Sequence, residues 1–154
     1  MTLHNTDEDR IEKRIELKAP RTRVWQALTD HAEFGQWFGA KLEGPFVPGK
    51  VMRGKITIPD YEHIQMEIAV QRMEPEGYFS YTWHPYAIEP EKDYSQEAPT
   101  LVEFRLEEMA EGTRLTVVES GFSKLPPERR AEAFRMNSGG WESQLENIER
   151  YVGN

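Results

Sequence analysis

Apolar and polar residues alternate along most of the chain, a pattern typical of β-strands that have one buried and one exposed face. The segment 11–18, IEKRIELK, shows this alternation first, and Ala19-Pro20 ends it. After Gly49 the alternation returns in five shorter runs that are separated by turn residues. The expected inward-facing residues of these runs are Met52, Ile56 and Ile58; Ile64, Met66, Ile68 and Val70; Phe79, Tyr81 and Trp83; Val102, Phe104 and Leu106; and Leu115, Val117 and Glu119. The pattern therefore predicts about six antiparallel strands.

The turn at Glu74–Gly77, with the sequence EPEG, is expected to join two of these strands in a hairpin. If this turn closes the hairpin, Val70 lies opposite Tyr81 and Ile68 lies opposite Trp83. The apolar faces of the two strands then coincide, as cross-strand packing requires.

Two short helices are expected after the first strand. One covers residues 21–28 and is opened by Pro20, because proline is well tolerated at the start of a helix. Thr29 or Asp30 can cap the second, which is expected to run through Trp37.

A long final helix is expected to begin at Pro126-Pro127. The residues of its apolar stripe recur at intervals of three, four and seven and are Phe134, Trp141, Leu145, Ile148 and Val152. Gly139 and Gly140 interrupt this stripe, and each glycine destabilises a helix interior by roughly 0.5–1 kcal/mol relative to alanine. The glycine pair therefore indicates a close approach of another element, a bend or an open space.

This order of elements predicts an α+β fold in which a curved antiparallel sheet grips the long C-terminal helix. The 154 residues are the size of one domain, so we expect a single domain over 1–154 with residues 1–10 as a flexible tail. The segment Pro85–Pro99 carries several prolines and acidic residues and is long enough to be a functional loop or a merely mobile one, of which the mobile loop is expected.

Composition narrows the classes of partner. The formal net charge of −8 disfavours nucleic acid and anionic membranes. The basic residues alternate with acids, as in RIEKRIELK and PPERRAEAFR, which is typical of solvated faces. Cysteine is absent, so disulfides, thiolate zinc sites and a cysteine nucleophile are excluded. Because no long apolar stretch or signal-peptide pattern occurs, we expect a cytoplasmic protein.

Four segments in the right order resemble one known superfamily. They are Ala19-Pro20-x-x-x-Val24-Trp25-x-Ala27-Leu28-Thr29-Asp30, then Trp37-Phe38-Gly39, then residues 113–122 (TRLTVVESGF), and finally Gly140-Trp141 with Leu145 and Tyr151. Together they resemble the START-like superfamily, also called SRPBCC, helix-grip or Bet v 1-type, in its branch related to the activator of heat-shock-protein ATPase homologues. The resemblance covers the chain from about Ile11.

This resemblance implies an open cup in which the sheet and the final helix enclose a cavity for a small apolar or aromatic molecule. Members of the superfamily include polyketide cyclases and dehydratases, binders of hormones or lipids, and stimulators of a chaperone ATPase. The fold alone does not choose among these functions.

The candidate ligand-binding residues combine large inward-facing side chains with the glycine of the final helix. They are Trp37, Met66, Tyr81, Trp83, Phe104, Glu119, Phe134, Gly140 and Trp141. Any one of the large residues is also explained by ordinary core packing, because large apolar side chains are usually buried.

Glu119 is the candidate catalytic residue. The alternation places this carboxylate among Leu115, Val117, Val102 and Phe104. An unpaired buried carboxylate would have a raised pKa, which suits a general acid or base. Alternatively, the strand ends there and Glu119 pairs with an arginine or with the N-terminus of the final helix.

His84 and Glu67 also fall opposite each other in the hairpin register, but on the outward face, where an exposed pair is expected. No HxH, HExxH or EF-hand pattern occurs, and neither do the glycine-rich nucleotide motifs or GxSxG. We therefore expect no metal and no cofactor.

Three functions remain open. The first is binding of a small apolar or aromatic molecule between the sheet and the C-terminal helix, without established catalysis. The second is a cyclase- or dehydratase-type enzyme that uses Glu119 as acid or base. The third, suggested by the resemblance, is a co-chaperone-like interaction module with a chaperone partner. A homodimer is also compatible with the sequence.

Overall fold

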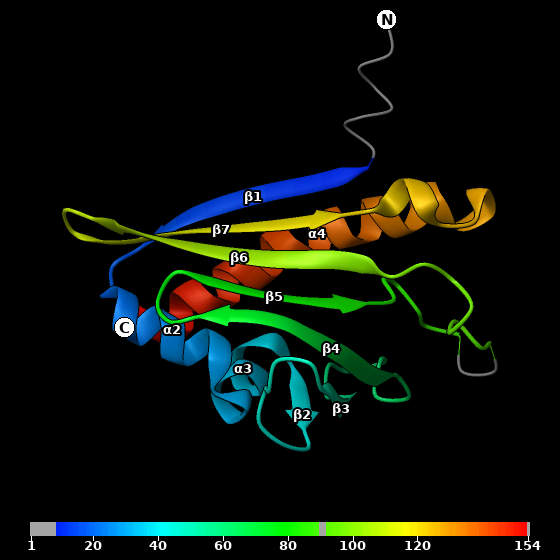
Figure 1. Cartoon of the computed structure of the whole chain (residues 1–154), viewed down its shortest axis with the longest axis horizontal. Helices are drawn as coiled ribbons and strands as arrows, with labels where there is room; N and C mark the ends of the chain where they lie inside the picture. Colours follow the sequence, from blue (N-terminus) through cyan, green and yellow to red (C-terminus); the bar gives the residue numbers. More distant parts are fainter. Residues whose placement is uncertain (1–8, 90–91, 154) are drawn as a thin grey trace, which may run out of the picture.

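One seven-stranded antiparallel sheet and a long helix dominate the computed structural model, which describes residues 9–89 and 92–153 (Figure 1). The strand order is β1-β7-β6-β5-β4-β3-β2. The strands are β1 (Arg10–Leu17), β2 (Ala40–Leu42), β3 (Val51–Ile56), β4 (Gln65–Glu74), β5 (Tyr78–Trp83), β6 (Thr100–Met109) and β7 (Gly112–Ser120). The helices are α2 (Arg21–Thr29), α3 (His31–Phe38), the 3-10 turn η1 (Phe122–Lys124) and α4 (Pro127–Val152). The predicted α+β helix-grip architecture is confirmed.

The strand that the alternation did not predict is β2. It has only three residues, too few to show a period of two, and it pairs with β3 through Ala40 and Ile56. In the hairpin of β4 and β5, Val70 pairs with Tyr81 as expected. The paired region of β4 and β5 ends at Ala69 and Thr82, so the expected pair of Ile68 and Trp83 lies just beyond it.

Helix α4 runs behind the sheet along much of its length (Figure 1). Its buried residues include Trp141, Leu145, Ile148 and Val152, as the stripe predicted. Phe134 is only partly buried and packs on Phe122, with ring centroids 5.3 Å apart.

The glycine pair in α4 leaves the helix unbroken. Apart from the helix's own backbone and the chain neighbours, no atom lies within 4 Å of the position that a Cβ would take at Gly139 or Gly140. Of the three explanations that the sequence allowed, open space is therefore observed at both glycines, and no other element approaches closely.

Helices α2 and α3 close one end of the fold. The Asp30 side chain accepts hydrogen bonds from the backbone N–H groups of Ala32 (3.0 Å) and Glu33 (3.1 Å), so Asp30 is the N-cap of α3. Gly35 is required inside α3, because a Cβ there would collide with the carbonyl oxygen of Ala40.

Residues 1–8 of the predicted tail lie outside the described residues. Asp9 and Arg10 do not fit that prediction, since Arg10 begins β1 and Asp9 accepts hydrogen bonds from the Ser123 N–H (2.9 Å) and hydroxyl (2.5 Å). Among the described residues, no helix is both long and apolar enough to cross a membrane.

Replacing Asp30 with alanine should lower the free energy of unfolding by about 1 kcal/mol, because the first turn of α3 loses the acceptor for two N–H groups. Urea denaturation followed by circular dichroism measures this change. Asp30→Asn is the matched control and should retain most of the stability, since asparagine caps helices equally well. Equal losses in both variants would contradict the capping role.

Candidate functional site

The carboxylate of Glu119 lies at the centre of the fold and is fully buried. Its Oε2 atom accepts hydrogen bonds from the indole N–H of Trp83 (2.8 Å) and the hydroxyl of Thr100 (2.5 Å). Its Oε1 atom accepts from the side-chain amide of Asn137 (2.9 Å) and the indole N–H of Trp141 (2.8 Å). One side chain of β7 thus holds together β5, β6 and α4.

All four donors to Glu119 are neutral. Among the described residues, no lysine, arginine or histidine forms an ion pair with it. The predicted burial of Glu119 is confirmed, and β7 ends one residue later, at Ser120. Neither expected pairing state is observed, because the carboxylate is neither unpaired nor paired with an arginine or a helix N-terminus. A carboxylate offers about four lone-pair sites, and all are filled here. The arrangement suits an ionised acceptor and leaves no lone pair free for a substrate proton.

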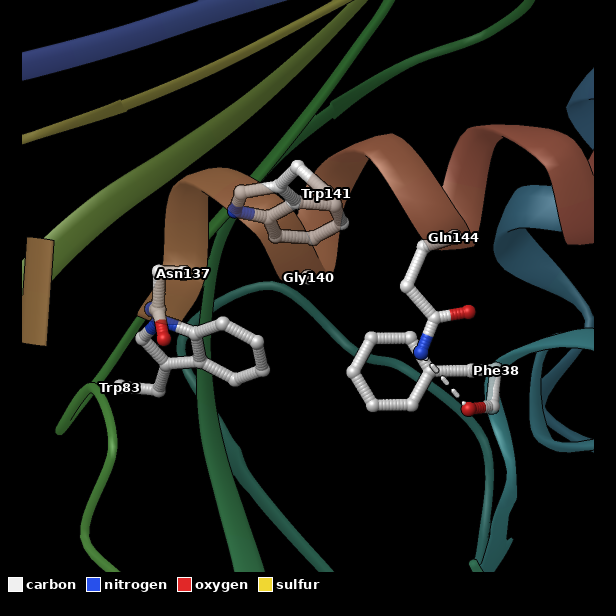
Figure 2. Close-up of a pocket in the computed structure, with 6 residues that line it drawn as sticks. All are labelled: Phe38, Trp83, Asn137, Gly140, Trp141 and Gln144. Atoms are coloured by element: carbon white, nitrogen blue, oxygen red, sulfur yellow. Dashed lines mark hydrogen bonds between the residues drawn. The ribbon is translucent and has the colours of Figure 1, made fainter. Parts of the chain in front are cut away.

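A pocket of about 130 Å³ lies beside this carboxylate, between β5 and α4 (Figure 2). Its wall consists of Phe38, Trp83, Asn137, Gly140, Trp141 and Gln144. The four residues of α4 among them are spaced at 137, 140, 141 and 144 and therefore share one helix face. Because Gly140 has no side chain, it leaves this part of the face open.

The amide groups at the pocket wall have fixed orientations. The Asn137 NH₂ group donates to Glu119, which places its Oδ1 atom on the other side. The Gln144 NH₂ group donates to the backbone oxygen of Phe38 (2.8 Å), and the Gln144 Oε1 atom accepts from Asn147 (3.0 Å). The pocket is thus lined by aromatic rings and oriented amides.

A larger cavity of about 720 Å³ adjoins the pocket and shares Phe38, Trp83, Asn137 and Gly140 with it. It lies between the β3–β4 connection, the segment after β5 and α4. Its further apolar wall residues are Ile56, Ile58, Tyr61, Ile64, Met66, Tyr86, Ala87, Ile88, Tyr94 and Met136. Both cavities together have the size of typical small-molecule sites.

Arg129 anchors the segment that follows β5. Its guanidinium forms an ion pair with Glu97 (2.8 Å), donates to the backbone oxygens of Pro85 and Tyr86 (3.0 Å each), and lies over the ring of Tyr94. The Arg129 side chain is only 10% exposed, so the expectation that the basic residues of this stretch are solvated is wrong for it. Pro85, Tyr86 and Glu97 are thus tied to α4, and the expected mobility of this loop stays a prediction.

The candidate ligand-binding residues divide into two groups. Met66, Trp83, Gly140 and Trp141 line one or both cavities. Trp37, Tyr81, Phe104, Glu119 and Phe134 line neither of the two; the Trp37 indole donates to the Ala27 oxygen (2.8 Å), and the Phe104 ring packs on Trp141 (5.7 Å). The ligand-binding role of the first group stays a prediction.

Sequence reasoning missed Phe38, Asn137 and Gln144 at the pocket wall. For Asn137 and Gln144 a signal existed, because two amides on the buried face of an apolar helix need a polar partner or a ligand. Phe38 follows the candidate Trp37 in the chain, but no sequence feature distinguishes Phe38 itself as a pocket residue.

His84 and Glu67 do not pair with each other. His84 Nε2 lies 3.0 Å from the backbone oxygen of Glu97, while Glu67 accepts from Arg53 (3.0 Å). Within the described ranges, no three His, Asp or Glu residues are grouped so that they could hold a metal ion.

The hydroxyl of Tyr81 is buried and has no hydrogen-bond partner in the described part of the chain. Burial, reinforced by the nearby charge of Glu119, raises the pKa of Tyr81 well above its usual value. Both effects disfavour the phenolate.

Replacing Glu119 with glutamine should lower the free energy of unfolding by about 1–3 kcal/mol. Threonine and asparagine can turn to accept from the new NH₂ group, but an indole only donates, so at least one tryptophan loses its acceptor. Chemical denaturation measures the loss. Glu67→Gln is the control: it removes the same charge at an exposed ion pair and should change stability by less than about 0.5 kcal/mol. Indistinguishable effects of the two substitutions would contradict the central role of Glu119.

Tyr81 should make stability depend on pH in alkaline solution. Its folded pKa is raised above the unfolded value, so its contribution is complete below the unfolded pKa of about 10 and is lost as pH rises towards the folded pKa. Above about pH 10 the unfolding free energy of the wild type should therefore fall relative to that of Tyr81→Phe. Near neutral pH the variant should be at least as stable, because it removes an unpaired hydroxyl. A constant difference across this pH range would contradict the assignment.

Solved structures with the same architecture span nearly the whole chain. The structure of MLL2253 from Mesorhizobium loti is 23% identical, with a TM-score of 0.73 over 92% of this chain and 94% of that one. The Aha1 dimer from Colwellia psychrerythraea is 17% identical, with a TM-score of 0.71 over 94% and 96%. At these identities the likeness shows the fold alone.

DynU16, a protein of the dynemicin biosynthetic locus, is 25% identical, with a TM-score of 0.69 over 94% of this chain. The chain spans about half the length of DynU16, since it covers 47% of that protein. No curated protein sequence matches this chain significantly. Residues 18–153 match the family described as Activator of Hsp90 ATPase homolog 1-like protein. Because this match covers most of the chain, the protein belongs to that family, within the START-like helix-grip fold.

Proposed function

We propose that this protein binds a small apolar or aromatic molecule in the two adjoining cavities between the sheet and α4. The observation that carries the proposal is the open wall at Gly140, where a continuous helix leaves space beside Trp83 and Trp141. Gly140 is exposed, so this space opens to solvent and a ligand can enter it without displacing a core side chain. A bound molecule then removes apolar ring surface from water.

The wall chemistry fits this role. Small-molecule sites are mostly apolar and contain a few oriented polar groups. Here Phe38, Trp83 and Trp141 supply the apolar surface, while Asn137 and Gln144 supply oriented amides. The location of DynU16 in a biosynthetic locus is consistent with a small-molecule role in this fold.

An acid–base enzyme built on Glu119 is less well supported. The carboxylate lines neither cavity, and each of its oxygens already accepts two hydrogen bonds. A general base needs a free lone pair within reach of the substrate proton. No contact within the described chain favours a chaperone-directed function over ligand binding.

Gly140→Leu should weaken binding of the neutral fluorescent probe N-phenyl-1-naphthylamine by about tenfold or more, which corresponds to at least about 1.4 kcal/mol. The leucine side chain would occupy the space that both cavities share. Fluorescence titration measures the affinity, and native mass spectrometry of the wild type identifies any co-purified molecule.

Gly139→Leu is the matched control. It introduces the same side chain into the same helix at the neighbouring glycine, which is exposed like Gly140 but lines neither cavity. Both substitutions improve helix propensity to a similar extent, so a difference between them reports on the cavity rather than on α4. Equal affinities for the probe in the wild type and both variants would refute the proposed site.

A further inference from the structure

Three aromatic rings in mutual contact form the apolar side of the inner pocket. The rings of Trp83 and Trp141 are stacked with centroids 5.8 Å apart, and the Phe38 ring lies 6.0 Å from Trp83 and 6.3 Å from Trp141 at steep angles. Figure 2 shows these three rings around the pocket, with Asn137 and Gln144 beside them. The faces of aromatic rings carry partial negative charge, and indole attracts cations most strongly.

A buried negative charge lies directly behind these rings. Glu119 accepts hydrogen bonds from the N–H groups of Trp83 and Trp141, the two indoles of the pocket. A charged acceptor draws the N–H dipoles towards itself and makes the rings more electron-rich. In the described part of the chain this carboxylate has no cationic partner, although buried charges are usually paired.

The polar atoms of the wall favour a positive or hydrogen-bond-donating ligand group. Because Asn137 donates to Glu119, its carbonyl oxygen is the atom left over, and none of the described residues donates to that oxygen. None of the six wall residues is ionisable. A carboxylate or phosphate placed here would face Glu119 without a cation to balance it.

The surroundings have the same electrostatic preference. Apart from tyrosines, the ionisable residues that line the larger cavity are Glu67, Glu89, Asp93, Lys92, His63 and His84. Glu67 is paired with Arg53 (3.0 Å) and Lys92 with Glu97 (3.6 Å), which leaves the carboxylates of Glu89 and Asp93 without an ion pair among the described residues. The net charge of −8 adds a long-range attraction for cations.

The volume of the pocket limits the size of the group that can enter. A cavity of about 150 Å³ holds one benzene ring, and the inner pocket measures about 130 Å³. A group with the bulk of a trimethylammonium head fits this space, while a fused ring system must extend into the larger cavity.

We propose that the inner pocket binds the ammonium group of an organic cation, a quaternary or protonated tertiary amine, whose apolar remainder occupies the larger cavity. This inference rests on the proposed small-molecule function and specifies the class of ligand. The pocket-lining surfaces of Phe38, Trp83 and Trp141 contact the cation, the Asn137 oxygen faces it, and Glu119 supplies the balancing charge through its hydrogen-bonded neighbours.

The test compares three probes of nearly equal shape. Choline carries a trimethylammonium group, 3,3-dimethylbutan-1-ol has a neutral carbon in place of the nitrogen, and 3,3-dimethylbutanoate is anionic. Titrations are followed by the indole N–H resonances in ¹⁵N-correlated NMR spectra. The chain has four tryptophans, so Trp25 and Trp37 serve as internal controls for Trp83 and Trp141.

Choline should shift the Trp83 and Trp141 resonances and bind about tenfold tighter than the neutral alcohol, and the anion should not bind. Phe38→Leu, which leaves the Glu119 hydrogen bonds untouched, should weaken choline binding about threefold or more without weakening that of the alcohol. If the alcohol binds as tightly as choline at the same two indoles, the cation proposal fails while the apolar site stands. If choline leaves both resonances unmoved, the cation proposal fails as well. In either case the naphthylamine titration decides the proposed function independently.

Discussion

The burial of one carboxylate constrains the whole molecule. Glu119 is removed from water near the end of β7, and such burial is tolerated only when the charge is fully hydrogen-bonded. The four donors come from three different elements, β5, β6 and α4, so the position of the helix on the sheet is set by hydrogen-bond geometry as well as by apolar packing. The Trp83 indole would lose its acceptor if β5 moved away, and Asn137 and Trp141 would lose theirs if α4 did.

The hydrogen bonds to Glu119 also position the wall of the pocket. Trp83 and Trp141 point their N–H groups at the carboxylate, so their ring faces are fixed relative to each other. Gly140 then leaves open the space that a side chain would have filled. Arg129 fixes the segment after β5 against the start of α4 and so holds one rim of the larger cavity. A rigid aromatic wall beside an open space is the outcome, and it suits recognition of a small ligand because little ordering is needed on binding.

Several features of the site could be predicted from sequence alone, and the reasons are local. The period of two placed Met66 and Trp83 on an inner face, and the period of 3.6 placed Trp141 on the buried side of the last helix. The glycine pair marked the position of the open wall. The apolar stripe of the last helix does not indicate Asn137 and Gln144, because both are polar. Arg129 is not indicated either, because basic residues among acids are usually solvated. In this fold both kinds of residue are buried by partners more than 30 positions away or on another element.

By itself, the sequence determined the family, the order of the α-helices and of every strand except β2, and the faces that pack together, because periodicity, caps and turn residues act over a few neighbouring positions. It also singled out Glu119 as a carboxylate on an apolar face. Only the tertiary structure decided what satisfies that carboxylate, since its donors at positions 83, 100, 137 and 141 come together only when the sheet and helix have assembled. The local sequence around Glu119 is compatible both with a carboxylate that has four neutral donors and with one in an ion pair. Only long-range packing distinguishes the two.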